Sequence, residues 1–165
     1  IIYLIIAIFV TVCLLSYNDY KITVFGSTSL IIVSDNKMQP DYNKGDLVFV
    51  ESSDEIEVGE KIFYYNTYNE QIKVNIGTVT EITEENNSKI IYTIDDGEHL
   101  ISSEFMIGPV STASSIQKVG TILGILESKW GFLFLIVLPA LLAFVNQIMV
   151  VVAGIKEARK IENEE

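Results

Sequence analysis

The sequence is poor in the residue types that most often carry metal and covalent chemistry. Its 165 residues include one cysteine, one histidine and three prolines. Because Cys13 is alone, no intramolecular disulfide can form, and no Cys or Cys/His metal site can be assembled. We therefore expect a domain that is stable through its apolar core, with no metal and no cofactor.

Basic residues are also scarce. The chain has 11 Lys and Arg against 22 Asp and Glu, so its formal net charge is −11. Most of the acidic residues lie between Ser16 and Ser128. A surface of this charge repels phosphates, which excludes nucleic acid as an expected partner.

Apolar residues are abundant but unevenly placed. They form 49% of the chain, and two uncharged blocks, Ile1–Leu15 and Trp130–Ile155, hold much of this excess. A helix that crosses a bilayer needs about 20 apolar residues, and the second block is long enough. We expect transmembrane helices at residues 1–15 and 130–155. The first is short and the chain does not begin with Met, so we expect this helix to be truncated. A signal peptide is the alternative, but no small-residue cleavage site follows the block.

The residues after the second block predict its orientation. Lys156, Arg159 and Lys160 lie in the tail at residues 156–165. Positive residues close to a span favour the cytoplasmic side. Two spans then predict a multi-pass protein of the cell membrane, with the lipid bilayer as a partner, both termini cytoplasmic and the middle of the chain extracytoplasmic.

The middle of the chain has the pattern of β structure. Runs rich in Val, Ile, Thr and Tyr occur at residues 21–25, 29–33, 47–50, 61–68, 71–82, 88–94 and 104–111, with Gly, Asn and Asp between them. Short strands with such turns are typical of a small β-barrel or sandwich. We predict a mainly β extracytoplasmic domain over residues 16–116. Near-helical apolar spacing then predicts an interfacial helix or linker over 117–129.

Several segments in this order resemble one known family. They are "VSDNKMQPDYNKGDLVFV", "VGEKIFYY", "GTVTEI", "YTIDDGE", "EFMIGPV" and "VGTILGILESKWGFLFLIVLPALLAF". Together they cover about residues 31–144. The set is similar to the type I signal peptidases of the archaeal, endoplasmic-reticulum and sporulating-bacterium type. That resemblance implies a serine endopeptidase fold that processes signal peptides beside the membrane during protein secretion.

The resemblance also implies where the chemistry of such an enzyme would lie. A serine before Met38 would be the nucleophile, a histidine would be its base, and an aspartate would orient that base. This chain has Lys37 at the nucleophile position, Gly77 at the base position and Asp96 at the orienting position. The corresponding binding-loop positions are Asp35, Asn36, Met38 and Pro40.

Lysine cannot replace serine in ordinary acyl transfer, and glycine has no side chain to accept a proton. No intact catalytic set is therefore expected. Ser34, His99 and Lys73 are the alternative catalytic residues, and an ion pair between Lys37 and Asp96 is a structural alternative. Asp95, Asp96 and Glu98 could be read as a metal loop, but they lack EF-hand spacing, so an acidic turn is favoured.

Three functions follow from these observations. The first is a signal-peptidase-like pseudoenzyme in the membrane that binds exported preproteins or an active signal peptidase. The second is an active membrane serine endopeptidase with rearranged catalytic residues. The third is a structural, membrane-anchored interaction module.

Overall fold

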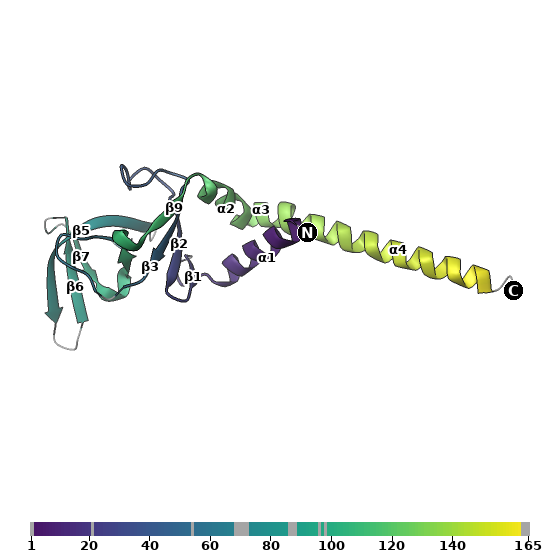
Figure 1. Cartoon of the computed structure of the whole chain (residues 1–165), viewed down its shortest axis with the longest axis horizontal. Coiled ribbons are helices and arrows are strands. Elements are labelled where there is room, and N and C mark those ends of the chain that lie inside the picture. The colour runs from purple at the N-terminus through teal and green to yellow at the C-terminus, as the bar shows by residue number, and fades with distance from the viewer. Residues whose placement is uncertain are drawn as a thin grey trace. The chain divides into compact units, whose positions relative to one another are not determined.

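The computed structural model describes residues 2–20, 22–53, 55–67, 73–85, 89–95, 97 and 99–162. The chain divides into two compact units, residues 1–124 and 125–165. The first unit holds two β-sheets and the second is helical (Figure 1). Each unit is described by itself.

The first sheet has four strands in the order β1-β2-β3-β9. Their bounds are β1 (Thr23–Phe25), β2 (Thr28–Ile32), β3 (Leu47–Glu51) and β9 (Ser114–Ile116). All neighbours are antiparallel, and Phe25 pairs with Thr28 across a two-residue turn. Gly26 begins that turn with a φ of 59°, as a tight hairpin of this kind requires.

The second sheet has five strands in the order β7-β6-β5-β4-β8. Their bounds are β4 (Lys61–Asn66), β5 (Lys73–Glu85), β6 (Lys89–Ile94), β7 (His99–Ser102) and β8 (Met106–Pro109). The 13 residues of β5 pair first with β4 and then with β6. An irregularity in register between Val79 and Glu81 marks the change.

Two apolar clusters lie on opposite faces of β4, because successive side chains of a strand alternate. The inter-sheet core contains residues of both sheets: Ile31, Val33, Met38, Tyr42, Val48, Val50, Phe63, Tyr65 and Ile107. The outer core lies on the other face of the second sheet: Ile62, Tyr64, Val79, Tyr92, Ile94 and Ile101. The inter-sheet core therefore joins the two sheets into a sandwich.

Helical segments flank and connect the strands. Helix α1 (Ile2–Leu15) precedes β1, and the Thr23 hydroxyl donates to the Cys13 carbonyl at 3.3 Å. Short 3₁₀ turns η1 (Ser103–Phe105) and η2 (Val110–Thr112) flank β8. Helix α2 (Val119–Glu127) follows β9, with Leu123 buried and Ile122 and Ile125 exposed. α2 lies within the segment 117–129 that was expected to be an interfacial helix or linker, and its place at a membrane interface stays a prediction.

The helical unit is nearly continuous. It consists of α3 (Lys129–Gly131), a π-helical segment labelled η3 (Phe132–Val137) and α4 (Leu138–Glu162). The Ser128 hydroxyl caps it by accepting the Gly131 N–H at 3.0 Å. Among the described residues, the stretch Lys129–Glu157 is the one helix long and apolar enough to cross a membrane.

Three expectations need correction. The β domain is not a barrel, because in the described part of the chain each sheet ends in two edge strands and neither closes. The fold is mixed rather than mainly β, since α1, α2 and α4 alone take 14, 9 and 25 residues. Two flanking spans are not supported. The 14 residues of α1 extend about 21 Å at 1.5 Å per residue, short of a hydrocarbon core of about 30 Å.

Candidate functional site

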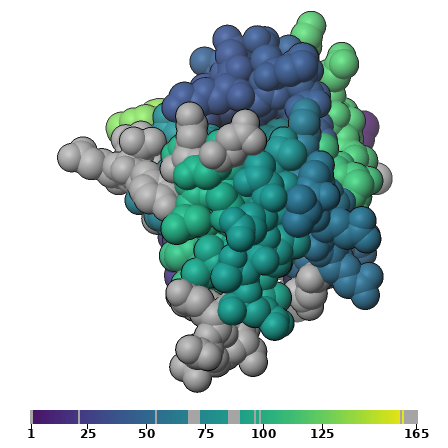
Figure 2. Space-filling view, turned by 90° about the vertical axis from the view of Figure 1, so that its left-hand side faces the viewer, coloured from purple at the N-terminus to yellow at the C-terminus, as the bar shows by residue number. Residues whose placement is uncertain are grey.

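The segment that resembles a nucleophile loop connects β2 to β3. Its two ends are closed by backbone hydrogen bonds, with the Val33 N–H donating to Asp46 at 3.0 Å and the Gly45 N–H donating to Val33 at 2.8 Å. The loop forms the dark blue projection at the top of the face shown in Figure 2. It is therefore a closed, protruding loop on the edge of the sandwich.

Two apolar side chains anchor this loop in the inter-sheet core. Met38 is 5% exposed and Tyr42 is 8% exposed. The Tyr42 ring lies 5.5 Å from that of Phe63, centroid to centroid. Burial of the Tyr42 hydroxyl raises its pKa, and the nearby Asp41 carboxylate raises this pKa further. The loop is thus held by packing, which fixes the positions next to Met38.

Lys37, the residue at the expected nucleophile position, is exposed. Its backbone N–H donates to the Asp35 carboxylate at 3.0 Å, which makes a local turn. Asn36 and Pro40 are exposed as well. A solvated ammonium can bind carboxylates and carbonyl oxygens, but it provides no hydroxyl for acyl transfer.

Two ion pairs join the loop to the hairpin of β4 and β5. The Lys61 ammonium lies 2.7 Å from the Asp41 carboxylate, and the Lys73 ammonium lies 4.0 Å from the Asp35 carboxylate. Lys61 begins β4 and Lys73 begins β5, at opposite ends of their ladder. The loop therefore spans the length of this hairpin. All four side chains are about one-third to one-half exposed, so each pair contributes at most about 1 kcal/mol.

Asp46 connects the loop to helix α2. This carboxylate is 5% exposed and accepts the backbone N–H groups of Asn43 at 3.0 Å and Lys118 at 3.2 Å. The Thr121 N–H donates to the adjacent Gly45 carbonyl at 3.0 Å. The Gly-Asp pair after the loop therefore has a structural role, since it couples the loop to the helix that precedes the apolar stretch.

Gly77, at the expected base position, faces away from the loop. It pairs with Ile62, and a Cβ atom built on it would collide with Ile94 and lie 3.2 Å from Tyr64. Those three neighbours belong to the outer core, whereas Met38 belongs to the inter-sheet core. The structure thus does not bring Lys37 and Gly77 together on one face of the sheet. The residue of β5 that it brings to the loop is Lys73.

A carboxylate does lie beside Gly77, and it is that of Asp95. One Asp95 oxygen accepts the Thr78 N–H at 3.0 Å, and the other would lie 3.0 Å from a Cβ on Gly77. Asp95 has a φ of 52° in the turn after β6. Asp96, the residue assigned to the orienting position, lies outside the described residues, as does Glu98.

Ser34 and His99 are the other two alternative catalytic residues, and they lie on different elements. Ser34 is exposed at the start of the loop. His99 pairs with Ile94 in β7, an edge strand separated from β5 by β6. Two strand spacings place it about 10 Å from β5. His99 thus lies two strands away from β5, the strand whose Lys73 pairs with the loop.

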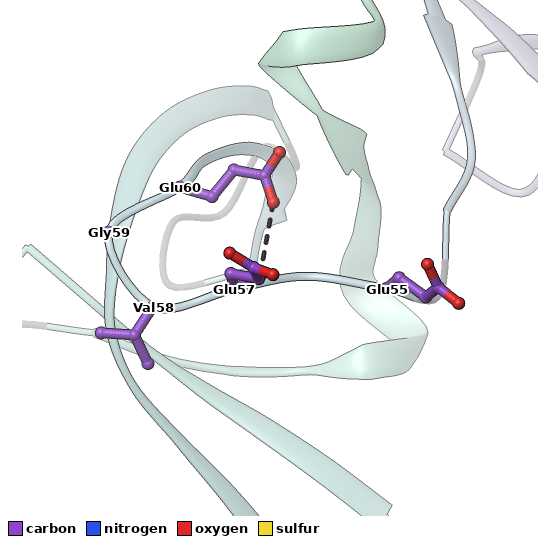
Figure 3. Close-up of a pocket in the computed structure, with 5 residues that line it drawn as sticks. All are labelled: Glu55, Glu57, Val58, Gly59 and Glu60. Atoms are coloured by element: carbon purple, nitrogen blue, oxygen red, sulfur yellow. Dashed lines mark hydrogen bonds between the residues drawn. The ribbon is translucent and has the colours of Figure 1, made fainter.

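An acidic hollow lies in the turn before β4. It is lined by Glu55, Glu57, Val58, Gly59 and Glu60 (Figure 3). Glu60 accepts the Glu57 N–H at 3.4 Å and the Ser111 hydroxyl at 2.6 Å. The part of the chain that the structure describes contains no group of three acidic, histidine or cysteine side chains placed to hold a metal. The hydrogen bonds of Glu60 instead close the turn.

Comparison with known proteins leaves the family open. No family model and no curated protein matches the chain. The resemblance to signal peptidases therefore rests on the quoted segments alone.

Reasoning from the sequence missed the roles of Asp46, Lys61 and Asp95. The available signal for Asp46 was its place after Gly45 in a turn, where a buried carboxylate can accept backbone N–H groups. No local sequence pattern predicts the two ion pairs or the face of β5 on which Gly77 lies. Both depend on the register between β4 and β5.

Proposed function

We propose that this protein is a membrane-anchored, signal-peptidase-like binding protein that has lost peptidase chemistry. It binds exported preprotein segments, or an active signal peptidase, through the loop between β2 and β3. The observation that carries the proposal is this loop, which is anchored by Met38 and Tyr42 and exposes Lys37 where a nucleophile would be required.

The charge around the loop supports binding of a peptide. Four lysines lie on the loop and its hairpin, and two of them, Lys61 and Lys73, are paired with Asp41 and Asp35. Lys37 and Lys44 are exposed, and an ammonium donates to backbone carbonyls and carboxylates. An extended peptide can also add to a sheet edge through main-chain hydrogen bonds. The two contacts together suit an exported segment in extended form.

Membrane anchoring in this proposal depends on the stretch Lys129–Glu157. Basic residues near the end of a span, here Lys156 and Arg159, favour the cytoplasmic side, and in this proposal the β unit is therefore extracytoplasmic. A topology with both termini cytoplasmic would require α1 to cross as well, and its 14 helical residues do not support that.

Binding and cleavage can be measured on the same sample. The full chain in nanodiscs would be offered peptides that span signal-peptide cleavage regions, with scrambled peptides as the reference. We expect preferential binding without cleavage, weakened several-fold by Lys37→Ala and less by the matched change Lys44→Ala in the same loop.

The two rivals give different results. Cleavage that is abolished by Ser34→Ala would establish an active serine endopeptidase with a shifted loop. Equal binding of native and scrambled peptides would instead favour a structural interaction module.

A further inference from the structure

Two amides interrupt the apolar helix that is long enough to cross a membrane. Asn146 and Gln147 lie in α4, and both are exposed. Along the 29 residues of Lys129–Glu157, Asn146 lies about 26 Å from one end and about 17 Å from the other, at 1.5 Å per residue. Both amides therefore lie within about 6 Å of the middle of the span, at the depth of hydrocarbon.

An amide at that depth requires a hydrogen-bond partner. Water is absent from the bilayer core, so an unpaired amide there is costly. Within the described residues, neither amide has a hydrogen-bond partner in its own chain, and the surrounding side chains are aliphatic or aromatic. A second membrane helix can supply such a partner through an interhelical hydrogen bond.

The two amides are adjacent in sequence, so they lie about 100° apart and stand within one broad face of the helix. Positions three, four or seven residues apart share a face. By this spacing small residues surround the amides, and we call this the amide face: Ala140, Ala143, Asn146, Gln147, Val150, Ala153 and Gly154. The opposite face holds larger side chains: Leu141, Phe144, Val145, Ile148, Val152 and Ile155. Small residues permit close approach of two membrane helices, which an amide hydrogen bond across them needs.

We propose that the amide face binds a second copy of this chain in a parallel dimer within the membrane. An amide carries both donors and an acceptor, so it is complementary to itself. Copies of one chain insert with the same orientation, which places Asn146 of each at the same depth. The span between Trp130 and Ile155 has no charged residue that would call for a partner of opposite charge. An isologous twofold interface satisfies these conditions.

The geometry can be tested by cysteine crosslinking in the membranes of expressing cells. The full chain would carry Cys13→Ala, so that the introduced cysteine is the only one. Val150→Cys lies on the amide face and Ile148→Cys on the opposite face, with nearly equal depth. We expect disulfide-linked dimer from Val150→Cys and little from Ile148→Cys. Equal crosslinking at both positions, or none at either, would overturn the proposal.

The role of the amide can be tested by energy transfer between labelled copies in proteoliposomes. Asn146→Leu should weaken association about 3- to 30-fold, the range for one interhelical amide hydrogen bond. The control Val152→Leu lies on the opposite face and should leave association unchanged. Equal effects of the two changes would refute the role of Asn146.

This inference depends on the membrane anchoring of the proposed function, and the two can fail separately. A chain that is released by alkaline extraction does not span the membrane, which overturns both. A chain that resists extraction but stays monomeric overturns only the dimer, and peptide binding by its loop is measured independently.

Discussion

Gly77 provides the most direct test of which side of β5 packs into the outer core. Its φ is in the ordinary range, so replacement by alanine creates no backbone strain. The new Cβ, however, would collide with Ile94, which is fully buried, and would lie 3.2 Å from Tyr64, which is 3% exposed. Neither neighbour has free space to move into, so the change overpacks the outer core.

The magnitude follows from two opposing effects. Overpacking of a tight core costs about 1–3 kcal/mol. Replacing glycine by alanine within a strand recovers about 0.5–1 kcal/mol of conformational entropy. We therefore expect Gly77→Ala to lower the free energy of unfolding by about 1 kcal/mol, which is the difference between the middles of these two ranges. Gly77→His places a ring in the same space and should cost more than about 3 kcal/mol.

Pulse proteolysis of the solubilised chain across a urea series would measure both losses. Ile94→Leu serves as the partner in a double-mutant cycle, because leucine lacks the branching methyl group that meets the new Cβ. We expect Gly77→Ala to be less harmful in the Ile94→Leu background. The reasoning is refuted if Gly77→Ala is as stable as the wild type. It is equally refuted if Lys37→Ser with Gly77→His folds normally and cleaves a preprotein.

Three further predictions concern the elements that support the loop. Gly120→Ala should destabilise the β unit by about 1–3 kcal/mol, because its Cβ would lie 2.5 Å from the Asp46 carbonyl oxygen, which is backbone and cannot turn away. In the matched change Gly124→Ala, the new Cβ would meet no atom closer than 3.8 Å. This change should stabilise α2 by about 0.5–1 kcal/mol, because alanine favours a helix more than glycine does. A lower free energy of unfolding for Gly124→Ala in the same denaturation series would contradict this. Asp46→Ala leaves two backbone N–H groups without their carboxylate and should lower the free energy of unfolding by about 1.5–3 kcal/mol. Its specific sign should be faster proteolysis within the loop. Burial raises the pKa of Tyr42 and Tyr65 above the ordinary tyrosine value of 10.0, so these groups ionise first in the unfolded state. Their contribution to stability is complete below pH 10 and declines as pH rises through the folded-state pKa values. In alkaline denaturation Tyr42→Phe should flatten this decline, and an unchanged slope would contradict the assignment.

Much of the strand pattern was predictable from the sequence. The runs at residues 29–33, 47–50 and 88–94 match β2, β3 and β6 closely, because Val, Ile and Tyr with Gly or Asn turns specify strands locally. β7 and β9 were missed. β9 consists of Ser114, Ser115 and Ile116, all exposed, and it is a strand because it pairs with β3. Such a strand has no pattern of its own.

The candidate site was predictable only in part. The segment around Met38 was expected to be a loop, and it is one, with Met38 buried in the inter-sheet core. The assignment of Lys37, Gly77 and Asp96 to catalytic positions stays a prediction. Counting residues along β5 gives a position but not the face on which it lies. Lys73 and Gly77 are four residues apart and start on the same face of β5, and the register with β4 decides that this face is the outer one. Lys73 meets the loop because it lies at the end of the ladder, where its long side chain can reach Asp35.

The sequence by itself determined two properties of this protein, the absence of an internal disulfide and the presence of a long apolar stretch. A single cysteine excludes an internal disulfide, and the apolar stretch after Lys129 is long enough to cross a bilayer. Both follow from residue counts and helix rise, which need no knowledge of neighbours. Only the tertiary structure decided which residues meet. It separated Gly77 from the loop, joined Asp35 to Lys73, and buried Asp46 between the loop and α2. These contacts join residues far apart in the chain, so no local pattern could have specified them.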